Sequence, residues 1–139
     1  MPLTSAQARA IIEAAETHAS KIRVPVVVAV IDATVNLKAF SRMDGAGLAS
    51  VDIAIKKART AALFEVNSEV VWEYCKPGAP APGLELTNGG LAPFPGGIPL
   101  KGVEGELVGA VGVSGGAAAQ DFEIAQAAAA AFAAHRSRK

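Results

Sequence analysis

The sequence is poor in cysteine and in aromatic residues, and it has no long uncharged apolar run. Its single cysteine, Cys75, excludes an intrachain disulfide and a metal site made of several thiolates. No apolar run reaches the length that spans a bilayer, and residues 1–12 lack the basic and then apolar pattern of a signal peptide. These absences predict a reduced, cytoplasmic protein with no membrane partner. Because aromatic residues make up only 5% of the chain, the core must rely on small and branched aliphatic side chains.

An excess of charge of either sign is also absent, because thirteen Asp and Glu residues balance thirteen Lys and Arg residues. A nucleic-acid surface needs clustered positive charge, so this balance argues against a nucleic-acid partner. Basic residues gather at the end of the chain, in His135, Arg136, Arg138 and Lys139, where a solvated C-terminal tail is expected. The length and the 51% of apolar residues fit one domain over residues 1–139.

The hydrophobic pattern predicts helices that alternate with two β-hairpins. Hairpins require antiparallel pairing, so we expect an antiparallel sheet with helices packed on it, and not a parallel doubly wound sheet. The expected helices are Ser5–Lys21, Ala49–Phe64, Ser68–Tyr74 and Ala117–Ala134, and the expected strands are Val26–Ile31, Leu37–Arg42, Ile98–Lys101 and Glu106–Val113.

The helix expected at Ala49–Phe64 is apolar around most of its circumference. At about 100° per residue, Val51 and Ile55 share one face, while Ile53 and Phe64 lie on another. Such a helix is covered on two sides, and we expect a partner subunit to form the second cover. A core built from small side chains also gains burial when the chain assembles, so the sequence predicts a homo-oligomer.

An irregular loop is expected at Lys76–Gly97, which holds five of the eight prolines and six glycines. Loops of this length inside a small domain usually carry function or cover a site or an interface.

The segment AVGVSGG, residues 110–116, is close to the G-x-G-x-x-G pattern of dinucleotide-binding proteins. In that fold the glycine turn opens the first βαβ unit, whereas here a hairpin precedes it and one helix follows. This order excludes a dinucleotide crevice. Two readings of the turn stay open: a tight turn that needs glycine, or a helix N-terminus where Ser114 and the amides of Gly115 and Gly116 hold an anionic group.

Charged residues follow the second expected strand and lie on the second long helix. Arg42 offers a planar fork for a carboxylate, and Asp44 is either a general base or a turn residue. Lys57 and Arg59 lie about 160° apart on the helix, so they cannot reach one ligand atom from the same side.

One histidine lies on the apolar face of the first helix, where Ala8, Ile11, Ala15, His18 and Ile22 recur at helical spacing. A histidine in this position is usually a hydrogen-bonded core residue, and the alternative is a haem or metal ligand. The two histidines of the chain do not have the spacing of a metal site, so no structural metal is predicted.

Four segments together resemble one known family: VVVAVIDATVNLKAFSRMDGA, KKARTAALF, PFPGGIPL and GELVGAVGVSGGAAAQD. They are similar, in this order, to the GlcG/HbpS family of haem-binding or haem-degrading domains. Related domains form the C-terminal part of PduO-type cobalamin adenosyltransferases. The resemblance covers nearly the whole chain, and the Lys76–Gly97 loop is its least matched part.

The resemblance implies a profilin-like three-layer α/β/α sandwich, assembled as dimers to octamers, with haem or a corrinoid as ligand. It implies a role in catabolic or redox-linked operons. Haem iron takes His, Met, Cys or Tyr as axial ligand, which makes Met43 and His18 the candidates. The positions that the resemblance assigns to a site are Arg42, Asp44, Lys57, Arg59, Gly97 and Ser114.

These observations leave three functional hypotheses. The first is an oligomeric protein that binds a tetrapyrrole or another anionic small molecule, with Arg42, Arg59, Ser114 and Gly115 as ligand contacts. The second is an isomerase, tautomerase or lyase for a small organic acid in a catabolic pathway, with Asp44 as proton carrier and Lys57 as cation. The third is a structural or regulatory oligomer. Whether the chain is an enzyme is left open.

Overall fold

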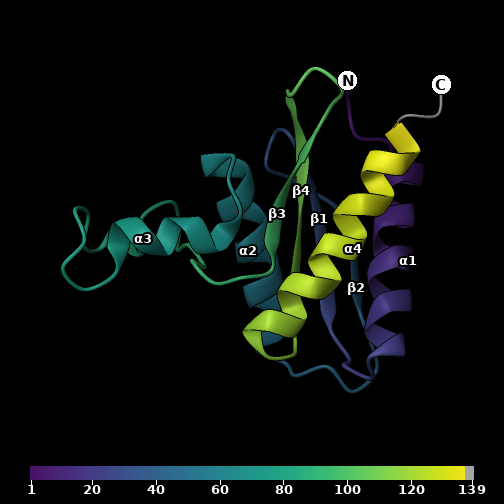
Figure 1. Ribbon diagram of the computed structural model, residues 1–139, viewed down its shortest axis with the longest axis horizontal. Helices are drawn as coiled ribbons and strands as arrows, with labels where there is room; N and C mark the ends of the chain where they lie inside the picture. The colour runs from purple at the N-terminus through teal and green to yellow at the C-terminus, as the bar shows by residue number, and fades with distance from the viewer. Residues whose placement is uncertain (137–139) are drawn as a thin grey trace.

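Four antiparallel strands form the centre of the molecule, and helices cover both faces of the sheet (Figure 1). The computed structural model describes residues 1–136, so Arg138 and Lys139 of the basic C-terminal group lie outside it. The main elements are α1 (Ser5–Lys21), β1 (Val27–Asp32), β2 (Leu37–Arg42), α2 (Ser50–Phe64), β3 (Gly97–Lys101), β4 (Leu107–Ser114) and α4 (Ala118–Arg136).

The strands lie in the order β2-β1-β4-β3, and each neighbouring pair is antiparallel. The two predicted hairpins are confirmed as β1–β2 and β3–β4, and the two central strands join them. Helices α1 and α4 pack on one face and α2 on the other, so the predicted three-layer α/β/α arrangement is confirmed. Among residues 1–136, no helix combines the length and the apolar character needed to cross a bilayer.

The larger part of the core lies between the sheet and the pair α1 and α4. Strand alternation turns Val28 and Val30 of β1 toward these helices, together with their register partners Val113 and Val111 of β4. Helix α1 begins at Thr4 with a capping box that includes Gln7, and it buries a stripe of small and apolar residues. The stripe consists of Ala8, Ile11, Ala15 and Ala19.

On the opposite face, α2 lies directly on the sheet at two glycines. Gly97 of β3 and Gly112 of β4 are register partners, so they lie side by side under the helix. A Cβ atom at Gly112 would lie 2.7 Å from the Ala58 nitrogen and still closer to the Ala54 carbonyl oxygen. A Cβ atom at Gly97 would meet the Lys57 carbonyl group in the same way. The absence of side chains therefore sets the distance between helix and sheet.

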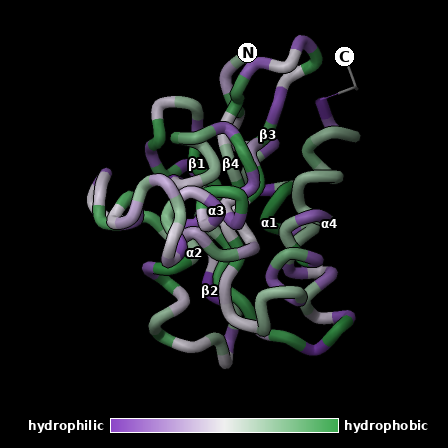
Figure 2. The backbone as a smooth tube through the Cα atoms, turned by 60° about the vertical axis from the view of Figure 1, so that its left-hand side comes forward, coloured by the Kyte–Doolittle hydropathy of each residue, from purple (hydrophilic) through white to green (hydrophobic). Residues whose placement is uncertain are grey.

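Residues 66–95 form an arm that extends beyond α2, on the side of the sheet away from α1 and α4 (Figures 1 and 2). Two hydrogen bonds hold the arm to α2: Arg59 Nη1 donates to the Asn88 carbonyl oxygen at 3.1 Å, and the Ala92 amide donates to Thr60 Oγ1 at 3.0 Å. The irregular loop predicted at Lys76–Gly97 is confirmed, since a 3₁₀ turn at Leu84–Leu86 is its only regular element before β3 begins at Gly97. The arm contains η1 (Ser68–Val71), α3 (Trp72–Cys75) and η2 (Leu84–Leu86).

Replacing Gly112 by alanine should destabilise the protein strongly, because the new methyl group would collide with the α2 backbone, which cannot rotate away. We expect Gly112→Ala to lower the free energy of unfolding in urea by about 2–3 kcal/mol or more. Gly47→Ala is the matched control, because nothing lies within 4 Å of a Cβ atom there and its backbone is not left-handed. That variant should stay within about 0.5 kcal/mol of the parent. Equal stability of the two variants would contradict the packing argument.

Candidate functional site

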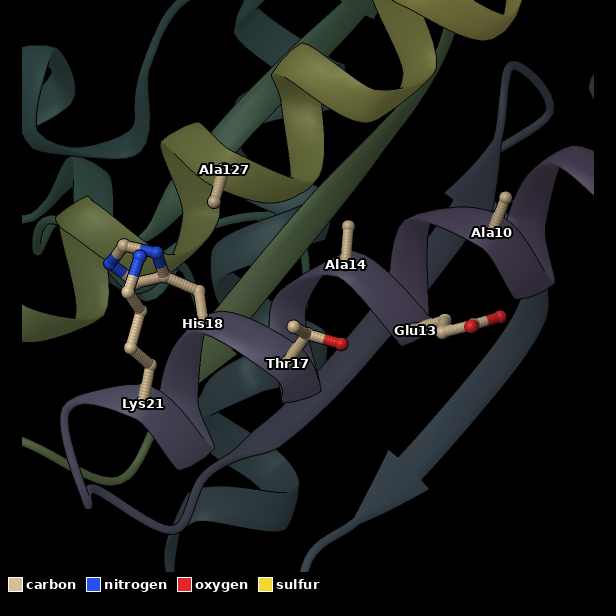
Figure 3. A pocket seen from close by; sticks show the side chains of 7 residues that line it. All are labelled: Ala10, Glu13, Ala14, Thr17, His18, Lys21 and Ala127. Carbon is tan, nitrogen blue, oxygen red and sulfur yellow. The ribbon is translucent and has the colours of Figure 1, made fainter.

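An open groove runs between α1 and α4 on the outside of the sandwich (Figure 3). Its volume is about 440 Å³, which lies within the usual range for small-molecule sites. Alanine side chains form much of its surface, so the groove has a smooth apolar floor. The lining residues are Ala10, Glu13, Ala14, Thr17, His18 and Lys21 from α1, and Ala127 from α4.

His18 lies at the edge of this groove and bonds to Glu123 of α4. The distance between His18 Nε2 and Glu123 Oε2 is 2.5 Å, and the two side chains are 26% and 52% exposed. The expectation that His18 is a core residue is therefore wrong. The buried stripe of α1 continues to Ala19 instead, which turns the imidazole toward the groove. Glu123 holds the ring by one nitrogen, as carboxylates do beside ligating histidines.

Charge is distributed unevenly along the groove. Lys21, one turn after His18, lies in the last turn of α1, where the helix dipole favours a cation. Glu13 lies toward the opposite end of the groove (Figure 3). Lys21 therefore offers an anionic group of a ligand one cation near the imidazole, with which the acid Glu123 already pairs.

Arg42, Asp44 and Ser114, which the sequence predicts for a site, follow or end strands at the same end of the sheet, but their side chains do not meet at one point. Arg42 of β2 and Ser114 of β4 both pair with Val27, so their side chains face the α2 side in one row. Two strand spacings separate them by about 9–10 Å. Arg42 and Asp44 are exposed, whereas Ser114 is buried and its hydroxyl donates to Ser50 Oγ at 3.3 Å.

The turn after β4 uses its own amide groups. The Gly116 amide donates to Asp121 Oδ1 at 2.8 Å, and the Ala117 amide donates to Gln120 Oε1 at 2.9 Å. The Gly116 amide is therefore occupied within the chain, which favours the tight-turn reading of this segment over an anion site. Gly115 adopts φ = 151° and lies tightly against Pro25, so a side chain would not fit there.

Lys57 forms a buried ion pair that connects α2 with α4. Its Nζ donates to Asp121 Oδ2 at 3.0 Å and to the Val113 carbonyl oxygen at 2.9 Å, and both charged side chains are only 4% exposed. Burial lowers the pKa of Lys57, and the Asp121 carboxylate opposes that shift in pKa. Arg59 points away toward the arm, in agreement with the angular separation of the two cations.

Two further candidates are engaged in local contacts. Gly97 is buried under α2, and its amide donates to Ser68 Oγ at 2.9 Å. Met43 is partly buried against the core, and its sulfur accepts a hydrogen bond from the Val26 amide at 3.5 Å.

Sequence reasoning missed Glu123 and Asp121, the two acidic residues of α4 that hold His18 and Lys57. They lie 105 and 64 residues from their partners, so no local pattern connects them. A signal did exist for Asp121, because it ends the GGAAAQD segment that carries the family resemblance.

The sequence and the fold are both similar to those of known proteins. The profile of the family described as haem degrading protein HbpS-like matches residues 3–130. The chain belongs to this HbpS-like family. It is 39% identical over 127 residues to a 15.0 kDa protein of the dhaT-dhaS intergenic region in Citrobacter freundii, covering 91% of this HbpS-like chain and 89% of that protein.

Two solved structures are similar to this HbpS-like chain over nearly its whole length. The crystal structure of Klebsiella pneumoniae protein ORFY superposes with a TM-score of 0.91 at 38% identity, covering 94% of this chain and 90% of that one. A crystal structure of a PduOC:heme complex superposes with a TM-score of 0.89 at 36% identity, covering 94% and 95%.

Removing the charge of Asp121 alone should lower the stability of the protein, because Asp121→Asn leaves the buried Lys57 ammonium group without its counter-charge. We expect a loss of about 3–5 kcal/mol in the free energy of unfolding, measured in urea. The double variant Lys57→Met, Asp121→Asn should recover most of that loss, because it removes both charges and keeps a side-chain oxygen at position 121 to accept the Gly116 amide.

Asp52→Asn is the control for Asp121→Asn, because it breaks the exposed Asp52–Lys56 pair on α2, the helix that carries Lys57. It should cost less than about 1 kcal/mol. A double variant no more stable than Asp121→Asn would show that the cost comes from packing and not from the unpaired charge.

Proposed function

We propose that this HbpS-like chain binds haem in the groove between α1 and α4, with His18 as the axial ligand. The observation that carries this proposal is the position of His18: a partly exposed imidazole, held by Glu123, beside an apolar floor of alanines. The match to a family described as haem degrading and the similarity to a PduOC:heme complex support it.

The residues of the groove fit the chemistry of haem. Imidazole is a common axial ligand of haem iron, and its two nitrogens allow one to hold a carboxylate while the other ligates the metal. The hydrogen bond to Glu123 would fix the orientation of the ring toward a bound metal. When bound, haem would supply a redox-active iron. The chain itself would orient the imidazole and exclude water from the porphyrin face.

The other groove residues suit a flat, dianionic macrocycle. Ala10, Ala14 and Ala127 have no long side chains, so a planar ring can approach the two helices closely. Lys21 lies one turn from His18 and would pair with a propionate group. The aromatic residues that often stack on a porphyrin are not needed where small side chains leave such a surface.

Met43, the second candidate ligand, has less support, because its sulfur already accepts the Val26 amide hydrogen and packs against the core. An enzyme for a small organic acid that uses Asp44 and Lys57 also has little support, because Lys57 is 3% exposed while Asp44 lies in solvent. Binding of a smaller anion by Arg42, Arg59, Ser114, Gly115 and Gly97 would require groups that are buried or that point apart.

We further propose that the chain is cytoplasmic and assembles with copies of itself through the open flank beside α2. Helix α2 packs over β1, β3 and β4, which leaves the same side of β2 with little cover. Phe40 on that side is 38% exposed and Leu48 is 78% exposed. A partner subunit would provide the second cover that the apolar circumference of α2 predicts.

Titration with haem, monitored at the Soret band, tests the haem proposal. The parent should show a saturable shift, and His18→Ala should lose the band of the histidine-ligated species. Glu123→Gln should weaken binding by about tenfold, because the carboxylate acts through the ring.

His135→Ala is the matched control, since it removes the only other histidine of the chain and should bind haem like the parent. An unchanged spectrum in His18→Ala would overturn the assignment of the ligand. If Met43→Leu alone removes the band, Met43 is the ligand instead.

Mass measurement in solution tests self-association. Phe40→Glu places a charge on the proposed interface, so its particles should be smaller than those of the parent in light scattering after gel filtration. Val103→Glu is the control, because Val103 is 62% exposed on the distant β3–β4 turn. Assembly by Phe40→Glu equal to that of the parent would reject this interface.

A further inference from the structure

The arm contains a pocket of its own, between α3 and the segment Pro93–Pro95. Its volume is about 370 Å³. The rings of Trp72 and Phe94 are 40% and 49% exposed, so both are accessible to a ligand. The arm that carries this pocket lies on the other side of the sheet from α1 and α4 (Figure 1), and the pocket shares no lining residue with the groove proposed for haem. Its lining consists of Glu69, Trp72, Glu73, Pro93, Phe94 and Pro95.

The two walls of this pocket are fixed relative to each other. The Ser68 hydroxyl donates to the Phe94 carbonyl oxygen and accepts from the Gly97 amide at 2.9 Å. Prolines on both sides of Phe94 restrict the backbone that carries the ring. The pocket is therefore preformed, and a ligand would lose little free energy in ordering it.

The pocket is also negatively charged. Within residues 66–95 three carboxylates face a single cation, Lys76. Lys76 pairs with Glu73 at 2.6 Å, which leaves Glu69 as the uncompensated acid of the pocket. Glu69 Oε1 is buried and has no hydrogen-bond partner among residues 1–136. A buried carboxylate oxygen without a donor raises the free energy of the folded state, and a cation nearby would lower it.

Aromatic rings, proline rings and a carboxylate together select one class of ligand. The ring faces of Trp72 and Phe94 attract cations through their quadrupoles, and quaternary ammonium groups are recognised in this way. A small metal ion would lose its hydration shell against a mostly carbon surface, whereas the methyl groups of an alkylated ammonium ion gain contact there. We propose that this pocket binds a small alkylated ammonium compound, with Glu69 as the counter-charge and Trp72 and Phe94 as walls.

Choline is a suitable probe, and 3,3-dimethylbutan-1-ol is its uncharged carbon analogue. Trp72 is the only tryptophan, so its fluorescence reports on this pocket alone. Saturation transfer from the protein to the methyl protons of the probe provides a second readout that does not depend on fluorescence. Choline should bind saturably and about tenfold more tightly than the alcohol, because only choline gains the cation–π and charge interactions.

Glu69→Gln should weaken choline binding by roughly fivefold and leave binding of the alcohol unchanged, because it removes only the charge. Glu104→Gln makes the same change in net charge on the exposed β3–β4 turn and should bind choline like the parent. The proposal is overturned if neither readout saturates with choline. It is also overturned if the alcohol binds as tightly as choline, or if Glu69→Gln and Glu104→Gln behave alike.

Discussion

The direct contact between the backbone of α2 and the glycine pair of β3 and β4 determines where the other parts of the molecule lie. Because Gly97 and Gly112 have no side chains, α2 approaches the sheet closely enough for Lys57 to extend past the strand end. There the ammonium group meets Asp121 in the first turn of α4. Asp121 also accepts the Gly116 amide, so one ion pair fixes the start of α4. Two residues later, Glu123 faces His18 across the helix pair.

The candidate residues therefore divide into two kinds, and only the first kind lies in the segments that carry the family resemblance. Gly97, Lys57 and Gly112 connect the layers, and they are buried without access for a ligand. His18, Glu123 and the alanines of the groove lie at the surface and are free to meet one. A shared motif in such a small domain can thus mark a contact between layers of the fold, while the candidate groove lies on a helix pair that this contact holds in place.

The architecture was largely predictable from the sequence, and the long-range contacts were not. Runs such as Val26–Ile31 and the turns between the strands act locally, so the hairpins and the helix order followed from them. The inner face of α1 was ambiguous at its end, because in an alanine-rich helix Ala19 gives a weaker hydrophobic signal than a regular period through His18. The glycines of AVGVSGG were interpreted as a turn motif. Their packing under α2 was missed, because the sequence of one strand does not show which helix packs across it. The partners of Lys57 and His18 lie on a helix far along the chain, where periodicity carries no information.

Ser68 joins the two ends of the arm, since it bonds to Phe94 and Gly97 where the chain returns to the sheet. Closing a flexible loop costs only about 0.6 kcal/mol more when its length doubles, so residues inserted at an exposed turn between these ends should change stability little. Relatives can therefore diverge in the length and sequence of this segment while the sandwich stays the same. The arm is thus the part of the chain whose length can change at the smallest cost to the stability of the sandwich.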